Sequence, residues 1–174
     1  MNRRDFLRTV GIAGAAIAWG SGPETGYGFM GTKDGSLEGN LTLLNLWGKK
    51  PDGVNKLYSA IYNSLATGPD ASFAEVAKDA ATQSLCKEQG VLHLGGPTLG
   101  SLAADGAKVW LRTTKPAKVE VRLNIDGKER SFGPVRSTLE SDLTAIIPVT
   151  GLKGGTTTPY RVLVDGQALS IPSN

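Results

Sequence analysis

The sequence predicts an α+β protein in which a short helical hairpin precedes an all-β sandwich. Two observations support this fold class. From Val54 to Gly90, apolar residues recur at helical spacing. After Gly90, short runs of alternating apolar and polar residues are separated by turn signals about every ten residues. We therefore expect a helical hairpin over residues 54–90 and a β-sandwich over residues 91–174.

The opening stretch "MNRRDFLRTVGIAGAAIAWG" predicts a twin-arginine export signal over residues 1–18. Its weakly apolar run is far shorter than the roughly 20 residues of a membrane-spanning helix. An amphipathic N-terminal helix is the alternative, but glycines recur within the stretch and disfavour it. The residues that carry the export motif are Arg3, Arg4, Phe6 and Leu7. We expect export by the twin-arginine translocase to the periplasm or the extracellular space, with no stable membrane span.

The charge balance gives no reason to expect a nucleic-acid partner. The chain has 19 basic and 16 acidic residues, with a net charge of +3. Removal of residues 1–18 leaves 16 basic and 15 acidic residues, so most of the excess positive charge belongs to the expected signal. The single cysteine, Cys86, excludes an internal disulfide.

The side chains that carry most enzyme chemistry are scarce. The chain has one histidine, His93, and one cysteine, Cys86, whereas a zinc site needs three or four converging ligands. Neither a Ser-His-Asp motif nor a phosphate-binding glycine loop is recognisable. We therefore predict no catalytic, cofactor-binding or metal-binding residue in this chain. His93 is expected to be an ordinary strand residue, and Cys86 a small helix residue rather than a redox thiol.

Residues 19–53 are rich in Gly, Pro, Asp and Asn, and we expect them to be mostly extended or irregular. The first helix of the hairpin should begin at Val54 and end before Gly68. Ser72 and Glu75 have the spacing of a capping box, which predicts a second helix that ends near Gly90. The apolar faces of this pair would pack on each other, on the apolar residues 41–47 or on the following domain. A cofactor or partner groove is the alternative.

Six segments after Gly90 have the pattern of strands, and Asp126-Gly127 is a two-residue hairpin signal. This spacing predicts a sandwich of the immunoglobulin or fibronectin type III kind. The expected strands are residues 91–94, 107–113, 118–125, 143–149, 160–164 and 167–171.

The alternation of "AKVWLRT" places Trp110 on one face of its strand and Val109 and Leu111 on the other. Alternation alone does not say which face points inward. Because sandwiches of this kind hold a core tryptophan, we expect Trp110 in the core. The helical hairpin would then cover Val109 and Leu111.

Three stretches, "GGPTLG", "AKVWLRT" and "GLKGGTTTPYR", resemble the N-terminal domain of PhoD-like (alkaline phosphatase D-like) proteins. The resemblance covers residues 95–166. Gly154 stands where the family has proline, and two extra residues precede Tyr160, which would form a tyrosine corner. The positions that match the family's structural motifs are Gly96, Pro97, Trp110, Arg112, Gly151, Leu152, Tyr160 and Arg161.

The resemblance implies that this chain is the non-catalytic N-terminal region of an exported phosphatase or phosphodiesterase. In that family a metallophosphatase domain follows the sandwich in cis and carries the catalytic residues, with calcium and iron. A stand-alone fibronectin-like module that binds cell-envelope polysaccharide or protein is the alternative. A third possibility is a purely structural envelope domain without a ligand.

Overall fold

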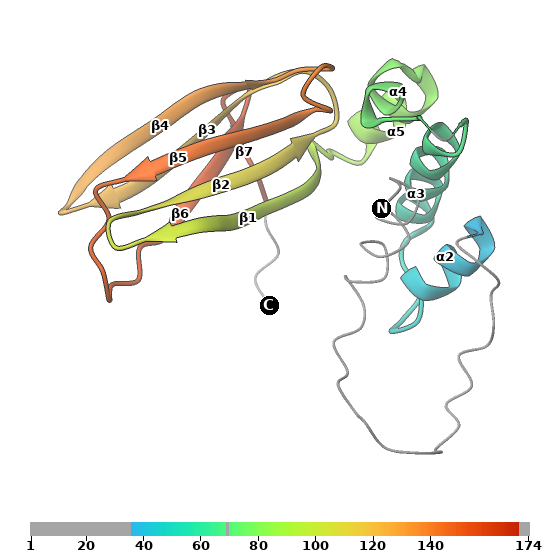
Figure 1. Ribbon diagram of the computed structural model, residues 1–174. Helices are drawn as coiled ribbons and strands as arrows, with labels where there is room; N and C mark the ends of the chain where they lie inside the picture. Colours follow the sequence, from blue (N-terminus) through green and yellow to red (C-terminus); the bar gives the residue numbers. More distant parts are fainter. Residues whose placement is uncertain (1–35, 69, 171–174) are drawn as a thin grey trace. The chain divides into compact units, whose positions relative to one another are not determined.

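The structure, a computed structural model, describes residues 36–68 and 70–170 (Figure 1). The chain divides into two compact units, Met1–Ala71 and Ser72–Asn174. The residues of the expected export signal lie outside the described ranges. Within these ranges, no helix has the length and apolar character needed to cross a membrane.

The described part of the first unit contains the helices α2 (Leu37–Leu44) and α3 (Asp52–Leu65). The hydroxyl of Ser36 accepts a hydrogen bond from the Gly39 amide at 3.1 Å and caps the start of α2. The expectation of an irregular segment was therefore wrong for residues 37–44. The prediction of a helix from Val54 was correct, and α3 begins two residues earlier, after Pro51.

The second unit begins with two short helices, α4 (Phe73–Lys78) and α5 (Ala80–Glu88). Ser72 is the N-cap of α4, as predicted, and its hydroxyl accepts from the Ala74 amide at 3.3 Å. The Glu75 half of the predicted capping box differs, because the Glu75 carboxylate accepts from the Lys78 ammonium at 3.1 Å. The prediction of one continuous second helix was wrong, because Asp79 has extended backbone angles and interrupts the helix between α4 and α5. The Asp79 carboxylate accepts from the Thr82 amide at 3.0 Å and so caps α5. The expected 54–90 hairpin is therefore not one unit, since α3 belongs to the first unit and α4 and α5 to the second.

Two antiparallel sheets follow, and the α+β fold class is confirmed at this level (Figure 1). One sheet has the strand order β1-β2-β5 and the other the order β4-β3-β6-β7. The bounds of the strands are β1 (His93–Ala103), β2 (Gly106–Thr113), β3 (Ala117–Ile125), β4 (Lys128–Ser137), β5 (Thr144–Thr150), β6 (Tyr160–Val164) and β7 (Gln167–Ala168).

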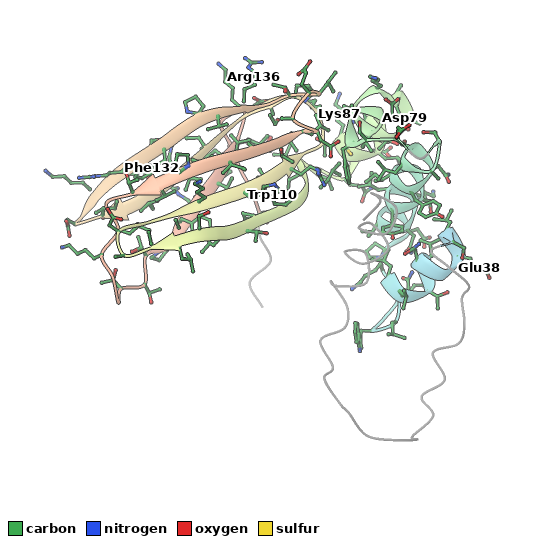
Figure 2. The ribbon with its side chains drawn as sticks, in the orientation of Figure 1. Glu38, Asp79, Lys87, Trp110, Phe132 and Arg136 are labelled. Carbon is green, nitrogen blue, oxygen red and sulfur yellow. The ribbon has the colours of Figure 1, made fainter. Side chains whose placement is uncertain are left out.

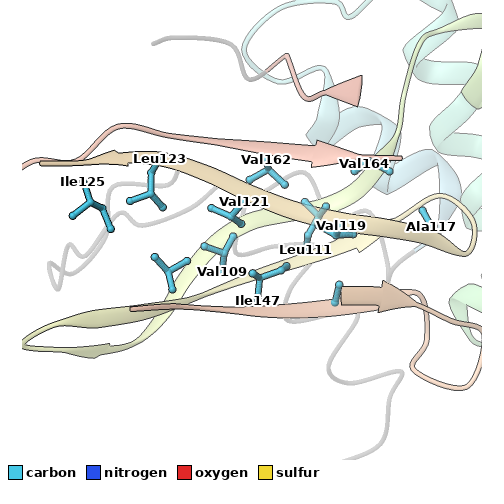
Figure 3. Close-up of a cluster of buried hydrophobic side chains, with 12 residues drawn as sticks. Val109, Leu111, Ala117, Val119, Val121, Leu123, Ile125, Ile147, Val162 and Val164 are labelled. Atoms are coloured by element: carbon cyan, nitrogen blue, oxygen red, sulfur yellow. The ribbon is translucent and has the colours of Figure 1, made fainter. Parts of the chain in front are cut away.

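Aliphatic side chains from both sheets form the core of the sandwich (Figure 3). The predicted alternation of β3 is confirmed, because its odd-numbered residues from Ala117 to Ile125 are buried. From the opposing sheet, Val109, Leu111 and Ile147 are at most 1% exposed. Burial of such side chains is the main stabilising contribution to a domain of this size.

The Asp126-Gly127 turn is also confirmed, since both residues have positive φ angles, 53° and 77°, between the paired ends of β3 and β4. The sequence of β4, "KERSFGPVRS", lacks a clean alternation, and its pattern did not predict the strand. Strand β1 continues to Ala103, well beyond the expected end at residue 94.

Candidate interaction surface

Trp110 lies on the outer face of the β1-β2-β5 sheet (Figure 2). Its neighbours Val109 and Leu111 point into the core, whereas Trp110 itself is half-buried. The expectation that Trp110 fills the core was therefore wrong. Val109 and Leu111 are covered by the opposing sheet rather than by the helices. The charged side chains of Lys108 and Arg112, on the same face as Trp110, are the sequence signal for this orientation.

Two glycines of β1 allow the Trp110 ring to lie against the neighbouring strand. A Cβ atom added to Gly95 would be 3.1 Å from Cη2 of the ring. A Cβ atom added to Gly96 would be only 2.6 Å from the main-chain oxygen of Trp110, and Gly96 has a φ angle of +82°. Gly96 therefore requires glycine, because a Cβ atom there would collide with backbone. At Gly95 a Cβ atom would crowd the Trp110 ring, which would have to shift by a few tenths of an ångström.

An exposed isoleucine lies beside Trp110. Thr98, Trp110 and Ile146 form one cross-strand row, and Ile146 is 51% exposed. Lys108 borders the same shallow groove. Leu99 also borders it, but Leu99 pairs with Val109, so its side chain points to the other side of the sheet. We call this surface the Trp110 face and define it as Thr98, Lys108, Trp110 and Ile146.

The outer face of the other sheet has a different chemistry. On β3, the Glu120 carboxylate accepts from the Arg122 guanidinium at 2.6 Å and from the Ser131 hydroxyl. These bonds lower the pKa of Glu120. On β6, Arg161 forms an ion pair with Glu129 of β4, and both side chains are more than half exposed. This outer face therefore carries ion pairs across β3, β4 and β6, although Leu163, which pairs with Glu120, is buried there.

Arg112 connects the Trp110 face to helix α4. Its guanidinium carbon lies 3.9 Å from the ring centroid of Phe73 and 5.5 Å from that of Trp110. The same guanidinium donates to the Asp142 carboxylate at 2.9 Å. The other oxygen of that carboxylate accepts from the Phe73 amide, in the first turn of α4, at 2.7 Å. Arg112, Asp142 and Phe73 thus attach α4 to the sandwich.

The remaining motif residues have structural positions. The Gly96–Pro97 peptide is cis, and Gly151 has a φ angle of +74° after β5. Leu152 and Tyr160 pack against the core. No hydrogen bond joins the Tyr160 hydroxyl to another described residue, so the tyrosine corner is not formed there.

His93 and Cys86 lie at ordinary structural positions. His93 is the first residue of β1, and burial lowers its pKa, an effect that a hydrogen bond with the Gly96 backbone partly opposes. Cys86 is 3% exposed in α5, and burial raises the pKa of its thiol. Across residues 36–68 and 70–170, no three His, Cys, Asp or Glu side chains come together in a way that could hold a metal ion.

Comparison with known families adds one similarity. Residues 91–174 match a family described as "Domain of unknown function (DUF7800)". The match covers all the strands of the sandwich and leaves out α4 and α5. Searches of the curated proteins and of the solved structures returned no match to this chain.

Proposed function

We propose that this chain is the exported N-terminal region of a PhoD-like phosphatase or phosphodiesterase. Its sandwich would be a non-catalytic module that orients a metal-dependent phosphoester hydrolase domain. That domain, with its calcium and iron, would follow in cis and carry the chemistry. The support is the resemblance of residues 95–166 to the N-terminal domain of that family, together with the twin-arginine motif at Arg3 and Arg4.

The arrangement of the strands supports a fibronectin type III-like identity for the sandwich. A three-stranded sheet faces a four-stranded sheet, and both sheets are antiparallel. Tyr160 begins β6, at the place where the family has its late-strand tyrosine. Trp110 does not occupy the core position usual for this fold, and its side chain lies on the outer face of the sheet instead.

The observation that carries the orienting role is the chemical difference between the two outer faces. The Trp110 face exposes Ile146 beside a half-buried tryptophan, and the Arg112–Asp142 ion pair lies at one end of the same sheet. The opposite outer face instead carries ion pairs across β3, β4 and β6. An exposed apolar surface rimmed by a charged side chain is typical of a protein interaction site. We therefore assign the Trp110 face as the surface that contacts the hydrolase domain.

The experiment begins with the genomic sequence downstream of residue 174. An in-frame continuation with clustered Asp, His and Asn motifs is expected.

The purified hydrolase domain would then be titrated with this chain, and the dissociation constant measured by calorimetry. Ile146→Glu should weaken binding at least tenfold, because it would bury an unpaired charge in the contact. Asn124→Glu, at an exposed strand position of the other sheet, is the matched control and should bind normally.

Two further measurements test the rest of the proposal. The chain alone should not hydrolyse phosphomonoesters or phosphodiesters with any divalent metal. Metal-dependent turnover that disappears in a His93→Ala variant would contradict this.

Replacing Arg3 and Arg4 with lysine should retain a reporter fusion in the cytoplasm. Unchanged export would contradict the prediction of a twin-arginine export signal.

The exposed part of Trp110 favours a second candidate, a stand-alone module that binds envelope polysaccharide. Aromatic rings commonly stack on sugar rings, and Trp110 lies on a groove. Affinity electrophoresis on polysaccharide gels would separate the two candidates. A retardation that Trp110→Ala abolishes, in a chain that does not bind the hydrolase domain, would favour the polysaccharide module.

A further inference from the structure

The loop between α2 and α3, residues 45–51, exposes two adjacent large apolar side chains. Leu46 is 56% exposed and Trp47 is 73% exposed. Val54, in the first turn of α3, is also 38% exposed. This 45–51 loop belongs to the first unit, whereas the Trp110 face belongs to the second.

The exposed pair stands on a loop that side-chain hydrogen bonds hold in place. The Asn45 amide group donates to the Leu41 carbonyl at 2.7 Å and to the Asn55 side-chain oxygen at 2.9 Å. The Asn45 side-chain oxygen accepts from the Lys50 amide at 2.7 Å, and the Asn55 amide group donates to the Lys50 carbonyl at 3.1 Å. Asn45 and Asn55 therefore join both ends of the loop to the two helices. Since the loop is already ordered, its exposed side chains can bind at a lower entropic cost.

Two lysines follow the apolar pair directly. The Lys49 ammonium lies 3.4 Å from the Asp52 carboxylate, and both side chains are more than 75% exposed. Lys50 is exposed and forms no ion pair with any described residue. The loop thus has a net positive charge beside its apolar tip. Tryptophan with flanking lysines is typical of segments that lie at a membrane–water interface.

The size of the exposed surface selects among possible partners. Leu46, Trp47 and Val54 together expose on the order of 300 Å² of apolar surface. A specific protein interface buries about 800 Å² on each partner. Weak insertion into a bilayer requires only a few protruding apolar groups and an attractive surface charge.

We propose that the 45–51 loop inserts Leu46 and Trp47 into the surface of an anionic lipid bilayer, with Lys49 and Lys50 facing the lipid phosphates. The contact would be peripheral and reversible. It does not depend on the Trp110 face, because the two surfaces belong to different units.

The test measures partition of the chain onto vesicles of phosphatidylcholine with about one third phosphatidylglycerol, at low salt, by co-sedimentation. Both the full chain and the chain from Trp19 would be used, because the basic, apolar start could bind vesicles by itself. Replacing both Leu46 and Trp47 with serine should lower the partition coefficient about tenfold or more. Replacing Lys49 and Lys50 with glutamine should lower it roughly fivefold per lysine on anionic vesicles.

Leu102→Ser is the matched control, because Leu102 is a 76% exposed leucine in the other unit, and it should leave partition unchanged. Trp47→Phe should retain most of the binding but lose the part of the fluorescence that brominated lipids quench. Equal partition of the Leu46/Trp47 double variant and the parent would overturn the proposal. So would Trp47-dependent dimers without lipid, which would assign the loop to a contact between copies of the chain.

Discussion

The Arg112 guanidinium and the Asp142 carboxylate lie 2.9 Å apart, and their side chains are only 19% and 21% exposed. Arg112 also donates from Nε to the main-chain oxygen of Asp142 at 3.1 Å. Because Asp142 accepts from the first turn of α4 as well, this pair links strand β2, the turn before β5 and the helices. An ion pair with this little exposure is screened less than a surface pair.

Asp142→Ala should therefore destabilise the second unit by roughly 2–3 kcal/mol, because it removes the partner of Arg112 and the acceptor for the Phe73 amide. Asp142→Asn should cost less, since the amide oxygen can still accept a hydrogen bond and asparagine also tolerates the φ angle of 54° found here. Urea unfolding monitored by circular dichroism measures both. Equal stability of the alanine variant and the parent would show that the link does not stabilise the fold.

The first strand's glycines provide a second prediction. Gly95→Ala should be destabilising because its Cβ would approach the Trp110 ring, and Trp110→Ala should cost about 1–2 kcal/mol as a half-buried side chain. The double variant should recover about 0.5–1 kcal/mol relative to additivity, because truncation of the ring removes the clash. Gly96→Ala should cost about 2 kcal/mol or more with no such recovery, since its conflict is with backbone. Additive effects at Gly95 and Trp110 would contradict the ring contact.

The folding unit should begin at Ser72 rather than at Val91, where the family match begins. A chain that starts at Val91 loses the Phe73 contacts to Arg112 and Asp142. It also loses the hydrogen bond from Gln83 to the Thr114 carbonyl, at 2.9 Å. We expect it to be less stable than the chain from Ser72 by roughly 2 kcal/mol or more. Thermal melts of the two chains side by side make the comparison, and coincident curves would place the helices outside the folding unit.

The lowered pKa of His93 predicts a pH dependence. Because the folded-state pKa lies below the ordinary value of 6.5, the unfolded chain binds the proton more readily. The stability contribution of His93 is therefore complete above pH 6.5, the ordinary pKa. It is lost as the pH falls from there through the lower folded-state pKa. His93→Gln should lose less stability than the parent between about pH 7 and pH 5, as measured by urea unfolding at each pH. Parallel losses in the two proteins would show that His93 is not desolvated.

The local features of the fold followed from the sequence. The alternation from Ala117 to Ile125, the Asp126-Gly127 turn and the Ser72 cap each depend on a few adjacent residues, and all three were predicted correctly. By contrast, the cap that Asp79 provides for α5 competes with helix continuation, and helical periodicity does not report this competition.

The sequence predicted which residues of β2 share a side, but not which side forms the exposed candidate surface. Alternation placed Trp110 opposite Val109 and Leu111, but it could not say which side of β2 another sheet would cover. That choice depends on the opposing strands β3 and β6, whose aliphatic side chains fill the core and leave Trp110 outside against Gly95. The pairing of Arg112 with Asp142 spans 30 residues and likewise exists only when β2 and the turn before β5 are side by side. Neighbouring residues fix the two sides of a strand, whereas packing between distant segments decides which side is buried.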